Sequence, residues 1–538
     1  MSKIVFVSLN ARYTHSTPAV YYLRESIKET AFSSQILSLT INQNIFEILE
    51  IISETKPDII AISVYIWNSE VVQKILPELK KILPKSQIIL GGPEVSYNSQ
   101  TWISKFPSVD LIISGNGEIP LKNFLLGKLK PLHKIIKSTE NNFNNTPFPY
   151  IKEDRKVLKN KYLYYEASRG CPFKCSYCLS SRTDQKLQHK IFQTIKKELD
   201  FLLSFQPLII KFIDRTFNAD RVLAKKIWEY LKDKNAKFHF EIHPGLLNEA
   251  DFELLETIPR GKFQFEIGIQ STNPKTLTEI NRVSDTDLIR KNVLKLKKMN
   301  NIHIHVDQIV GLPYEDYESF RNSFDDIYKL NADKFQLGFL KVLHGTELEE
   351  KSKEYDLKYF ESAPYEIISN KWISFKEITY IKKLEELLEN YKNSNKYELS
   401  LQYILHFFPR PIVFWESLLN YFIENKLDIK IKKWDKLTQI LLDFLKIQND
   451  FTPELILDYL RLDWIIMKKN IFFPTSISNR LDKKLAFLNK NKRKILSEIN
   501  IEFDKNKLDK ILLFYSPNLE IPKISDLEII NLPENILE

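Results

Sequence analysis

The sequence predicts an α/β protein in which two parallel sheets precede a mostly α-helical domain. Residues 1–128 alternate short apolar strands with amphipathic helical patterns, and this alternation resumes six times between Tyr162 and Leu343. Beyond about residue 350, leucine and aromatic side chains recur at helical spacing instead, which indicates packed helices. We therefore predict a first α/β domain, a linker, a second α/β domain and a helical domain, over residues 1–128, 129–160, 161–350 and 351–538.

The first domain is predicted to be a Rossmann-like parallel sheet, because βαβ repeats place successive strands side by side. Its expected strands are Lys3–Leu9, Gln35–Leu39, Asp58–Ile66, Gln87–Leu90 and Leu111–Ser114, with helices such as Ser69–Ile82 between them. Ligands of such sheets bind beyond the carboxyl ends of the strands, where glycines let a flat or bulky ligand approach the backbone. The residues predicted to line that edge are Asn10, Arg12, His15, Tyr65, Trp67, Gly91, Gly92, Glu94, Gly117 and Glu118.

The second α/β domain follows a linker whose run Asn141–Pro149 is polar and broken by prolines. Its expected strands are Tyr162–Ser168, Leu208–Asp214, Lys237–His243, Gln264–Gln270, His303–Gly311 and Phe335–Leu343. Helices such as Asp220–Lys232 and Val283–Met299 fall between them. Six strand–helix units in a row predict an open, partial (β/α)6 barrel with its active site at the carboxyl ends of the strands.

All three cysteines of the chain, Cys171, Cys175 and Cys178, follow the first strand of this barrel within eight positions. A structural zinc site normally closes with four ligands, and a second pair of cysteines is missing from the sequence. A [4Fe-4S] cluster held by three cysteines leaves one iron open for another ligand. The alternative is a chance group of buried or zinc-binding cysteines.

The spacing Cys-x3-Cys-x-aromatic-Cys, with Tyr177 at the aromatic position, resembles the motif of the radical S-adenosylmethionine (SAM) enzymes. The resemblance implies that the three thiolates hold three irons while the amino and carboxylate groups of SAM chelate the fourth. It also implies that an electron from the cluster cleaves SAM to methionine and a 5′-deoxyadenosyl radical.

Later strand ends are similar to segments of the same family, among them the string Glu266–Ser271, Arg282 and the turn Gly311–Pro313. A lone acidic residue at a strand end is as often a helix cap, so the family likeness depends on their joint order. The SAM contacts that the resemblance implies are Tyr177, Asp214, Thr216, Glu241, Glu266, Gln270, Ser271, Arg282 and Asp307. By strand alternation, His303 and His305 share a face with Asp307, either as substrate or metal contacts or, by default, as hydrogen-bonded core histidines.

The first domain resembles the cobalamin-binding domain that precedes the barrel in one class of radical SAM enzymes, chiefly through its Gly-Gly-Pro-Glu and Gly-x-Gly-Glu turns. The Asp-x-His-x-x-Gly pattern that supplies a histidine ligand to cobalt in some such domains is absent. Cobalamin is therefore expected to bind without a histidine ligand, or else the domain has lost its cofactor. His15 is as consistent with a hydrogen-bonded loop residue as with a ligand contact.

Three functions remain compatible with these motifs. The first is a radical SAM enzyme that uses cobalamin to methylate an unactivated carbon. The second is a cobalamin-independent or non-methylating radical rearrangement or cyclisation enzyme, and the third is an iron–sulfur and corrin sensor without turnover. Methylthiotransferases carry three further N-terminal cysteines, and none precedes Cys171 here.

Composition restricts the classes of substrate and the cellular compartment that we expect for the protein. A net charge of +9 is modest for this length and is carried mostly by lysine, whereas bidentate phosphate contacts rely on arginine, so a nucleic-acid substrate is disfavoured. A small-molecule substrate is expected, together with a low-potential electron donor such as flavodoxin or ferredoxin. No apolar run reaches the roughly 18 residues that span a bilayer, and no signal-peptide region is evident. Cysteines confined to an oxygen-labile motif predict the reducing cytoplasm.

The helical domain contains no catalytic constellation, and we expect it to shape or close the substrate pocket. Its predicted helices are Ile373–Asn390, Pro411–Glu424, Lys432–Ile447, Thr452–Lys468 and Lys483–Asn500, followed by two late strands at Ile511–Ser516 and Leu527–Ile530.

Overall fold

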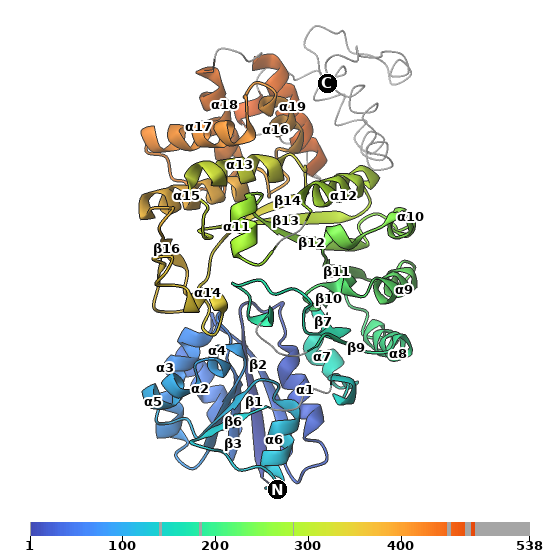
Figure 1. The fold of residues 1–538 in the computed structure, drawn as a ribbon, viewed down its shortest axis with the longest axis vertical. Coiled ribbons are helices and arrows are strands. Elements are labelled where there is room, and N and C mark those ends of the chain that lie inside the picture. The colour runs from blue at the N-terminus through green and yellow to red at the C-terminus, as the bar shows by residue number, and fades with distance from the viewer. Residues whose placement is uncertain are drawn as a thin grey trace. The chain divides into compact units, whose positions relative to one another are not determined.

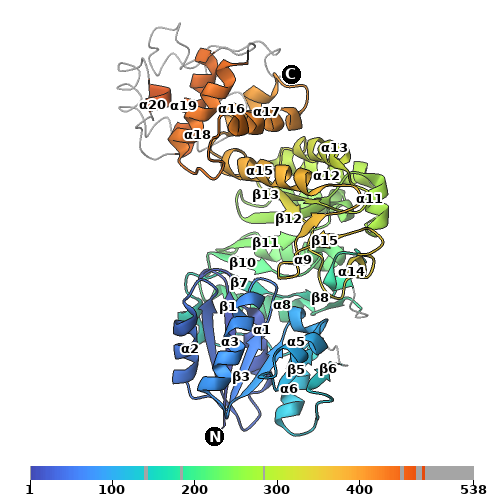
Figure 2. The same ribbon diagram turned by 90° about the vertical axis from the view of Figure 1, so that its left-hand side faces the viewer.

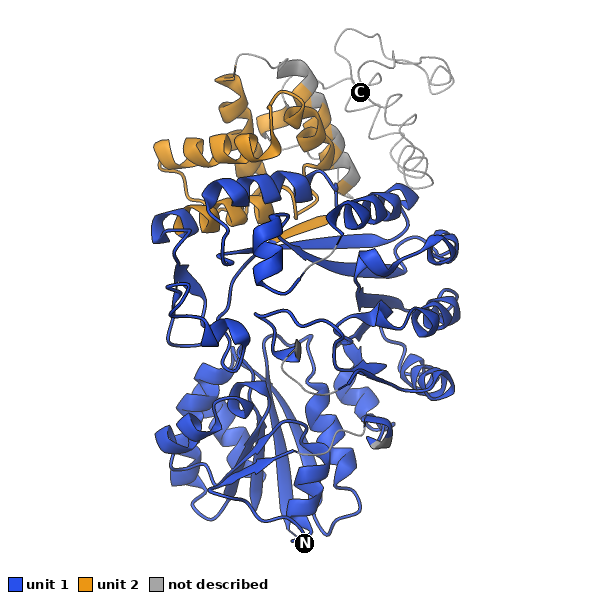
Figure 3. Cartoon of the chain, viewed as in Figure 1, with its two compact units in different colours: residues 1–332, 337–378 blue, residues 333–336, 379–538 orange. Residues whose placement is uncertain are grey.

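The computed structural model describes residues 2–138, 143–181, 186–282, 285–448, 453–467 and 475–478. The chain forms two compact units (Figure 3), of which the first comprises Met1–Ala332 and Leu337–Ile378 and the second Asp333–Gln336 and Thr379–Glu538. The first unit contains the N-terminal sheet and most of the second sheet, so the residues discussed below as a site belong to one unit. None of the described helices is long and apolar enough to cross a membrane.

The N-terminal sheet has six parallel strands in the order β2-β1-β3-β4-β5-β6, which confirms the predicted Rossmann-like fold. Helices α2 and α3 cover one face and α1 and α6 the other (Figure 1). The strands are β1 Lys3–Asn10, β2 Ser33–Thr40, β3 Ile59–Ser63, β4 Gln87–Gly91, β5 Leu111–Ser114 and β6 Ile135–Lys137. The helices are α1 Pro18–Ser26, α2 Ile45–Glu54, α3 Ser69–Ile82, α4 Pro93–Ser96, α5 Ser99–Lys105 and α6 Glu118–Leu125.

The sixth strand lies within the range predicted to be a linker. β6 pairs in parallel with β5, so residues 129–160 begin as part of the first sheet. The strand is only three residues long and has a single buried side chain, Ile136. Such a short stretch carries too little alternation to be recognised in the sequence.

The second sheet has the order β14-β13-β12-β11-β10-β7, so its strands follow one another as a partial barrel requires. Helices α8, α9 and α10 lie together along one side of it (Figure 1), and Figure 2 shows its strands from β7 to β13 one after another. The strands are β7 Leu163–Tyr165, β10 Ile209–Phe212, β11 Lys237–Glu241, β12 Phe263–Gln270, β13 His303–Val310 and β14 Lys334–Phe339. The helices from α7 to α13 are Asp154–Leu158, Phe192–Leu203, Arg221–Leu231, Glu249–Glu256, Pro274–Glu279, Thr286–Met299 and Tyr317–Tyr328.

Short elements complete this part of the chain. Antiparallel strands β8 Ser168–Arg169 and β9 Gln188–His189 form one small ladder. A second ladder pairs β15 Lys358–Tyr359 with β16 Ile367–Ser369, after helix α14 Glu347–Glu350. Single 3₁₀ turns occur at Phe143–Asn145, Leu179–Ser181, Phe217–Ala219 and Pro244–Leu246.

The C-terminal part is helical, as the periodicity predicts. Its helices are α15 Phe375–Tyr391, α16 Glu398–Leu405, α17 Pro411–Glu424, α18 Trp434–Lys446, α19 Pro453–Met467 and α20 Thr475–Ser478. Asp463 of α19 accepts hydrogen bonds from the backbone N–H groups of Leu399 (3.0 Å) and Ser400 (2.9 Å), and so caps the N-terminus of α16. The predicted helix Lys483–Asn500 and the two late strands lie outside the described residues.

Candidate active site at the cysteine loop

The cysteine loop, residues 168–178, begins at the carboxyl end of β7 and is held by two backbone hydrogen bonds near its C-terminal end. The backbone N–H of Ser176 donates to the carbonyl of Ile280 (3.0 Å), and the carbonyl of Ser176 accepts from Leu348 N–H (2.9 Å). Gly170 has φ 101°, a left-handed conformation that favours glycine directly before Cys171. The loop therefore follows the first strand of the partial barrel, as the sequence predicts, and its backbone is held from two sides.

The three thiols occupy different environments within this loop. Cys175 is buried, while Cys171 and Cys178 are partly exposed. Burial raises the pKa of Cys171, whose Sγ lies 3.7 Å from the Thr216 hydroxyl. Among the described residues, no group of three or more His, Cys, Asp or Glu side chains is placed to hold a metal ion. A four-iron cluster binds each thiolate to a different iron, and this donor set fits such a cluster with one open iron.

Arg282 reaches the cysteine loop from the segment after α11. Its Nη1 lies 3.6 Å from Cys175 Sγ, and its Nη2 donates to the carbonyl of Gly268 on β12. A planar guanidinium beside the cluster thiols can bind a carboxylate through two parallel hydrogen bonds. The position of Arg282 thus suits the role that the family resemblance gives it.

Gln270 ends β12 in an unusual conformation. Its φ is 74°, and the register between β12 and β13 shifts between Gly268 and Gln270. A Cβ on Gly268 would lie 2.1 Å from Gln270 Nε2, so the carboxamide folds back over the glycine. Its Oε1 is buried without a hydrogen-bond partner, which is costly unless a ligand supplies a donor.

Three carboxylate side chains lie on the same face of the second sheet. Glu241 and Glu266 are register partners, and Asp307 lies beside Gly268 on the neighbouring strand. Burial, with the like charges of Glu266 and Glu241, raises the pKa of Asp307 to about 8, and its Oδ1 has no hydrogen-bond partner. Burial likewise raises the pKa of Glu241 to about 7, whereas a hydrogen bond from His239 (2.9 Å) lowers that of Glu266. The raised pKa favours the protonated form of Asp307, which can donate a hydrogen bond as well as accept one.

Two residues predicted as SAM contacts are engaged with the protein itself. Asp214 accepts from Ala167 N–H (3.1 Å) and from the Ser168 hydroxyl (2.5 Å), so it braces the start of the cysteine loop. The hydroxyl of Ser271 donates to Glu315 Oε1 (2.6 Å) in a buried group. The sequence indicates that both follow strands but not which neighbour each side chain meets.

Tyr177 and the paired histidines also have protein partners. Burial raises the pKa of Tyr177, which lies beside Arg282 and Cys175. His303 and His305 pack edge to face, with ring centroids 4.7 Å apart, and the side-chain amide of Gln264 lies 3.0 Å from His305 Nε2. These contacts match the default interpretation of the two histidines.

Residues not predicted as site residues also support the loop. The ring of Phe173, between the first two cysteines, stacks on His243 with centroids 4.9 Å apart. Asn218 holds His243 in place by exchanging two 2.9 Å hydrogen bonds with its backbone. Burial, followed by the charge of Arg282, lowers the pKa of His243 to about 4, so the ring is neutral near pH 7. Aromatic residues at strand ends were the only sequence signal for this contact.

The carboxyl edge of the first sheet is largely committed to internal contacts. Asn10 is 2% exposed and hydrogen-bonds to Leu39 O (3.0 Å) and Thr17 Oγ1 (2.9 Å). Glu94 accepts from the hydroxyl of Tyr365. A Cβ on Gly92 would lie 2.4 Å from the carbonyl oxygen of Val64, so this glycine serves backbone packing. A Cβ on Gly91 would meet its neighbours at an ordinary van der Waals distance, and a Cβ on Gly117 would lie close to a leucine side chain.

An aromatic surface remains at this edge. Tyr65 and Trp67 stack with centroids 4.2 Å apart and planes 9° from parallel, and Trp67 is 44% exposed. Arg12 is exposed nearby in sequence, after β1. His15 Nδ1 instead lies 2.6 Å from the hydroxyl of Tyr164 on β7, so it is a hydrogen-bonded loop residue. A stacked aromatic pair fits a flat ligand such as a corrin better than the polar side chains do.

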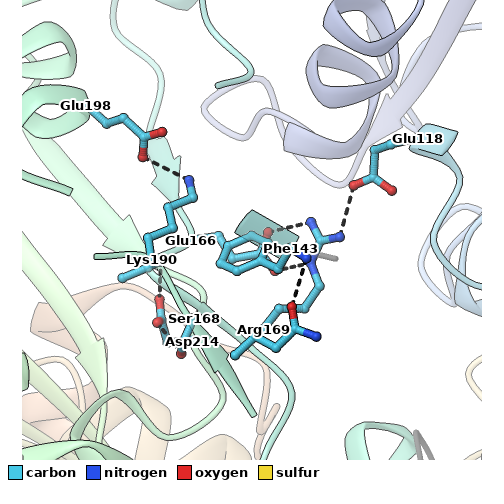
Figure 4. Close-up of polar contacts among 10 residues, drawn as sticks. Glu118, Phe143, Glu166, Ser168, Arg169, Lys190, Glu198 and Asp214 are labelled. Carbon is cyan, nitrogen blue, oxygen red and sulfur yellow. Dashed lines mark hydrogen bonds and ion pairs between the residues drawn. The ribbon is translucent and has the colours of Figure 1, made fainter. Parts of the chain in front are cut away.

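Glu118, the last of the predicted edge residues, turns toward the cysteine loop (Figure 4). Its Oε1 accepts from Arg169 Nη1 (3.0 Å), and Arg169 also binds Glu166. The start of α6 and the cysteine loop are thereby in direct contact.

Two family matches agree with this geometry. Residues 4–125 match the B12 binding domain family, and residues 165–327 match the radical SAM superfamily. The chain is therefore a radical SAM protein with a B12 binding domain ahead of its partial barrel. More particularly, residues 353–515 match a C-terminal family described as protein of unknown function (DUF4080).

Individual relatives are distant. The cobalamin-dependent radical SAM methyltransferase TokK of Streptomyces tokunonensis is 24% identical over 346 residues, covering 56% of this chain and 50% of TokK. The 2-(S-pantetheinyl)-carbapenam-3-carboxylate methyltransferase of Streptantibioticus cattleyicolor is 23% identical over 314 residues, covering 51% of this chain and 45% of that protein. The chain thus spans about half the length of these curated relatives.

A solved structure extends the likeness to nearly the whole chain. The cobalamin-dependent SAM radical enzyme OxsB, with aqua-cobalamin and SAM bound, superposes with a TM-score of 0.60 at 15% identity. The match covers 96% of this chain and 83% of OxsB, and it shows a shared fold. The predicted cofactors, a [4Fe-4S] cluster, SAM and cobalamin, are confirmed by the two matched domain families.

Proposed function

We propose that the protein is a radical SAM enzyme that uses cobalamin to methylate an unactivated carbon of a small-molecule substrate. The observation that carries the SAM part is the position of Arg282, 3.6 Å from Cys175 Sγ, beside the unpartnered Oε1 of Gln270 and Oδ1 of Asp307. A cation and two unsatisfied oxygens next to cluster thiols are what a zwitterionic, hydroxyl-bearing ligand requires.

The residues of this chain hold and orient the reactants. Cys171, Cys175 and Cys178 would ligate three irons, and the reduced cluster supplies the electron for SAM cleavage. Arg282 would pair with the carboxylate of SAM, while Gln270 and Asp307 receive its ammonium or ribose hydroxyl groups. Binding all these groups at once fixes the reacting bond, which lowers the entropic part of the barrier.

Cobalamin would bind at the carboxyl edge of the first sheet without a protein histidine. His15 is the only histidine in residues 4–125, and its Nδ1 is hydrogen-bonded to Tyr164. The stacked Tyr65 and Trp67 offer the flat surface for the corrin. Reduced protein with cobalamin should therefore show a Co(II) spectrum without nitrogen hyperfine splitting from a histidine.

Methyl transfer, rather than another radical outcome, is supported by the two curated relatives, both of which are methyltransferases. We also propose a small-molecule substrate, a flavodoxin- or ferredoxin-type electron donor and a cytoplasmic location, since the cluster needs a reducing compartment. A rearrangement or cyclisation enzyme would use the same SAM site, so only the fate of the methyl group separates the two.

The test begins with anaerobic reconstitution and reduction. Wild-type protein should bind about four irons per chain, release 5′-deoxyadenosine from SAM and bind hydroxocobalamin. Cys175→Ala should lose the full cluster, and Arg282→Lys should weaken SAM binding about tenfold or more. Arg290→Lys, an exposed arginine on α12, is the matched control and should behave as wild type.

Two outcomes would contradict the proposal. A full cluster in Cys175→Ala would exclude the cysteine assignment. Absence of hydroxocobalamin binding to the wild type would exclude the methylcobalamin route. With SAM carrying a deuterated methyl group, label appearing in cobalamin supports methyl transfer, whereas cleavage without labelled cobalamin favours a rearrangement.

A further inference from the structure

Arg169 lies two residues before the first cysteine, and its guanidinium is shared between two parts of the first unit (Figure 4). Nη1 donates to Glu118 Oε1 (3.0 Å), whereas Nε (3.0 Å) and Nη2 (2.8 Å) donate to the two carboxylate oxygens of Glu166. Glu118 begins α6, directly after the carboxyl end of β5, and Glu166 follows β7. One side chain therefore joins the B12 binding domain to the barrel.

The ion pairs are shielded from water. The side chains of Arg169, Glu118 and Glu166 are only 15%, 11% and 13% exposed. The guanidinium lies 4.8 Å from the ring centroid of Phe143 and 5.7 Å from that of Tyr22, and both rings are buried. Low local polarity strengthens such contacts, so we expect a stiff link.

The backbone of Arg169 transmits its position to the cluster ligand. Arg169 pairs with Gln188 in the β8–β9 ladder, and its neighbour Ser168 is fixed by Asp214. Only Gly170, in a left-handed conformation, separates Arg169 from Cys171. A displacement of Glu118 would therefore be transmitted to Cys171 through the side chain of Arg169 and the backbone of Gly170.

We propose that Arg169 is a positioning residue that couples the cobalamin edge of the first sheet to the cluster loop. The inference rests on the proposed function, because it takes the carboxyl edge of the first sheet as the cobalamin site and the cysteine loop as the cluster site. Coupling of this kind is reciprocal: loading the cluster and SAM should tighten cobalamin binding by the factor with which cobalamin tightens SAM binding. Glu118 carries the connection on the side of the first sheet.

Glu118→Ala removes the connection but leaves the pair between Arg169 and Glu166. Glu118→Gln keeps the shape and a weaker hydrogen bond from the Arg169 guanidinium to a neutral acceptor, and so provides a graded variant that preserves packing. Arg24→Gln is the matched control, because Arg24 makes a similarly buried ion pair with Asp154 (2.6 Å) and neither residue belongs to the cysteine loop. Both ion pairs tie the first domain to later residues, but only Glu118 meets the cysteine loop.

Two measurements test the coupling on the full-length chain. In the wild type, hydroxocobalamin should bind about fivefold or more tightly when cluster and SAM are present than when they are absent. In Glu118→Ala this ratio should fall below about twofold, in Glu118→Gln it should be intermediate, and in Arg24→Gln it should stay as in the wild type. Equal ratios in all four proteins would overturn the proposal.

Hydrogen exchange gives a readout that needs neither cobalamin nor turnover. In the cluster-loaded protein, the amides of residues 169–175 should exchange about fivefold or more faster in Glu118→Ala than in Arg24→Gln. Unchanged exchange would show that Arg169 does not position the loop. If the wild type fails to bind hydroxocobalamin, the proposed function loses its cobalamin part, while the exchange result still decides the role of Arg169.

Discussion

Asp214 can be tested as a SAM contact or as a brace, meaning a residue that holds the start of the cysteine loop in place. The family resemblance implies that it binds SAM, whereas the structure gives its two oxygens to Ala167 N–H (3.1 Å) and the Ser168 hydroxyl (2.5 Å). The residue is 2% exposed, so Asp214→Ala would leave two buried donors without partners. At about 1–3 kcal/mol for each unpaired donor, the first unit should lose about 2–6 kcal/mol of unfolding free energy.

Asp214→Asn separates geometry from charge. The carboxamide oxygen can still accept from Ala167 N–H, and its NH2 can donate to Ser168 Oγ, because a hydroxyl can accept as well as donate. The asparagine variant should therefore keep both contacts and lose less than about 1 kcal/mol. If Asp214 acts as a brace, the alanine variant loses the cluster and the asparagine variant keeps it.

The assay combines urea unfolding of the cluster-free protein with iron and sulfide analysis after anaerobic reconstitution. SAM affinity is then measured by equilibrium dialysis on each variant that holds a cluster. Our reasoning would be refuted by an Asp214→Ala protein that unfolds like the wild type and reconstitutes fully. Weaker SAM binding in both variants, with their clusters intact, would restore the role of SAM contact.

Three further predictions address stability. Gly92→Ala places a Cβ 2.4 Å from Val64 O at a φ of 103°, so the free energy of unfolding measured in urea should fall by about 2 kcal/mol or more. An unfolding free energy equal to that of the wild type would show that the turn can relax. Burial raises the pKa of Glu315 from 4.5 to about 7; the folded state then binds the proton more tightly, so unfolding free energy should fall by about 3 kcal/mol between about pH 4.5 and 7. Glu315→Gln should make that fall smaller by about 3 kcal/mol and leave the part that comes from Asp307 and Glu241, whose pKa values are also raised. A pH dependence unchanged from the wild type would contradict the assignment to Glu315. Asp463→Ala should destabilise the helical unit by about 2 kcal/mol, seen as lost helical circular dichroism at lower urea, whereas equal midpoints would mean that water caps α16 instead.

Much of the fold follows from local patterns. The helices Ser69–Ile82 and Pro411–Glu424 have the same bounds in the sequence prediction and in the structure. Apolar periodicity marks both, and a proline at the first position of α17 suits a helix start. β6 and α16 were missed, because a three-residue strand and a two-turn helix carry weak periodic signals.

The roles of polar side chains were harder to predict. Asn10, Glu94 and Glu118 stand at strand ends, where a ligand contact is a reasonable expectation. Each meets another part of the chain instead: Leu39, Tyr365 and Arg169, respectively. Their partners lie between 29 and 271 residues away, and spacing within one strand carries no information about them.

The sequence alone determined the chemistry of the cysteine loop, because three thiols within eight residues are neighbours in any compact fold. It also determined that the loop follows the first strand of a partial barrel, since strand alternation is a local property. The tertiary structure decided which charged groups face the cluster and which serve the scaffold. Arg282 and Asp214 are both polar residues near strand ends, yet one reaches Cys175 and the other braces Ala167 and Ser168. That difference arises from long-range packing, which fixes the donor or acceptor that each buried group meets.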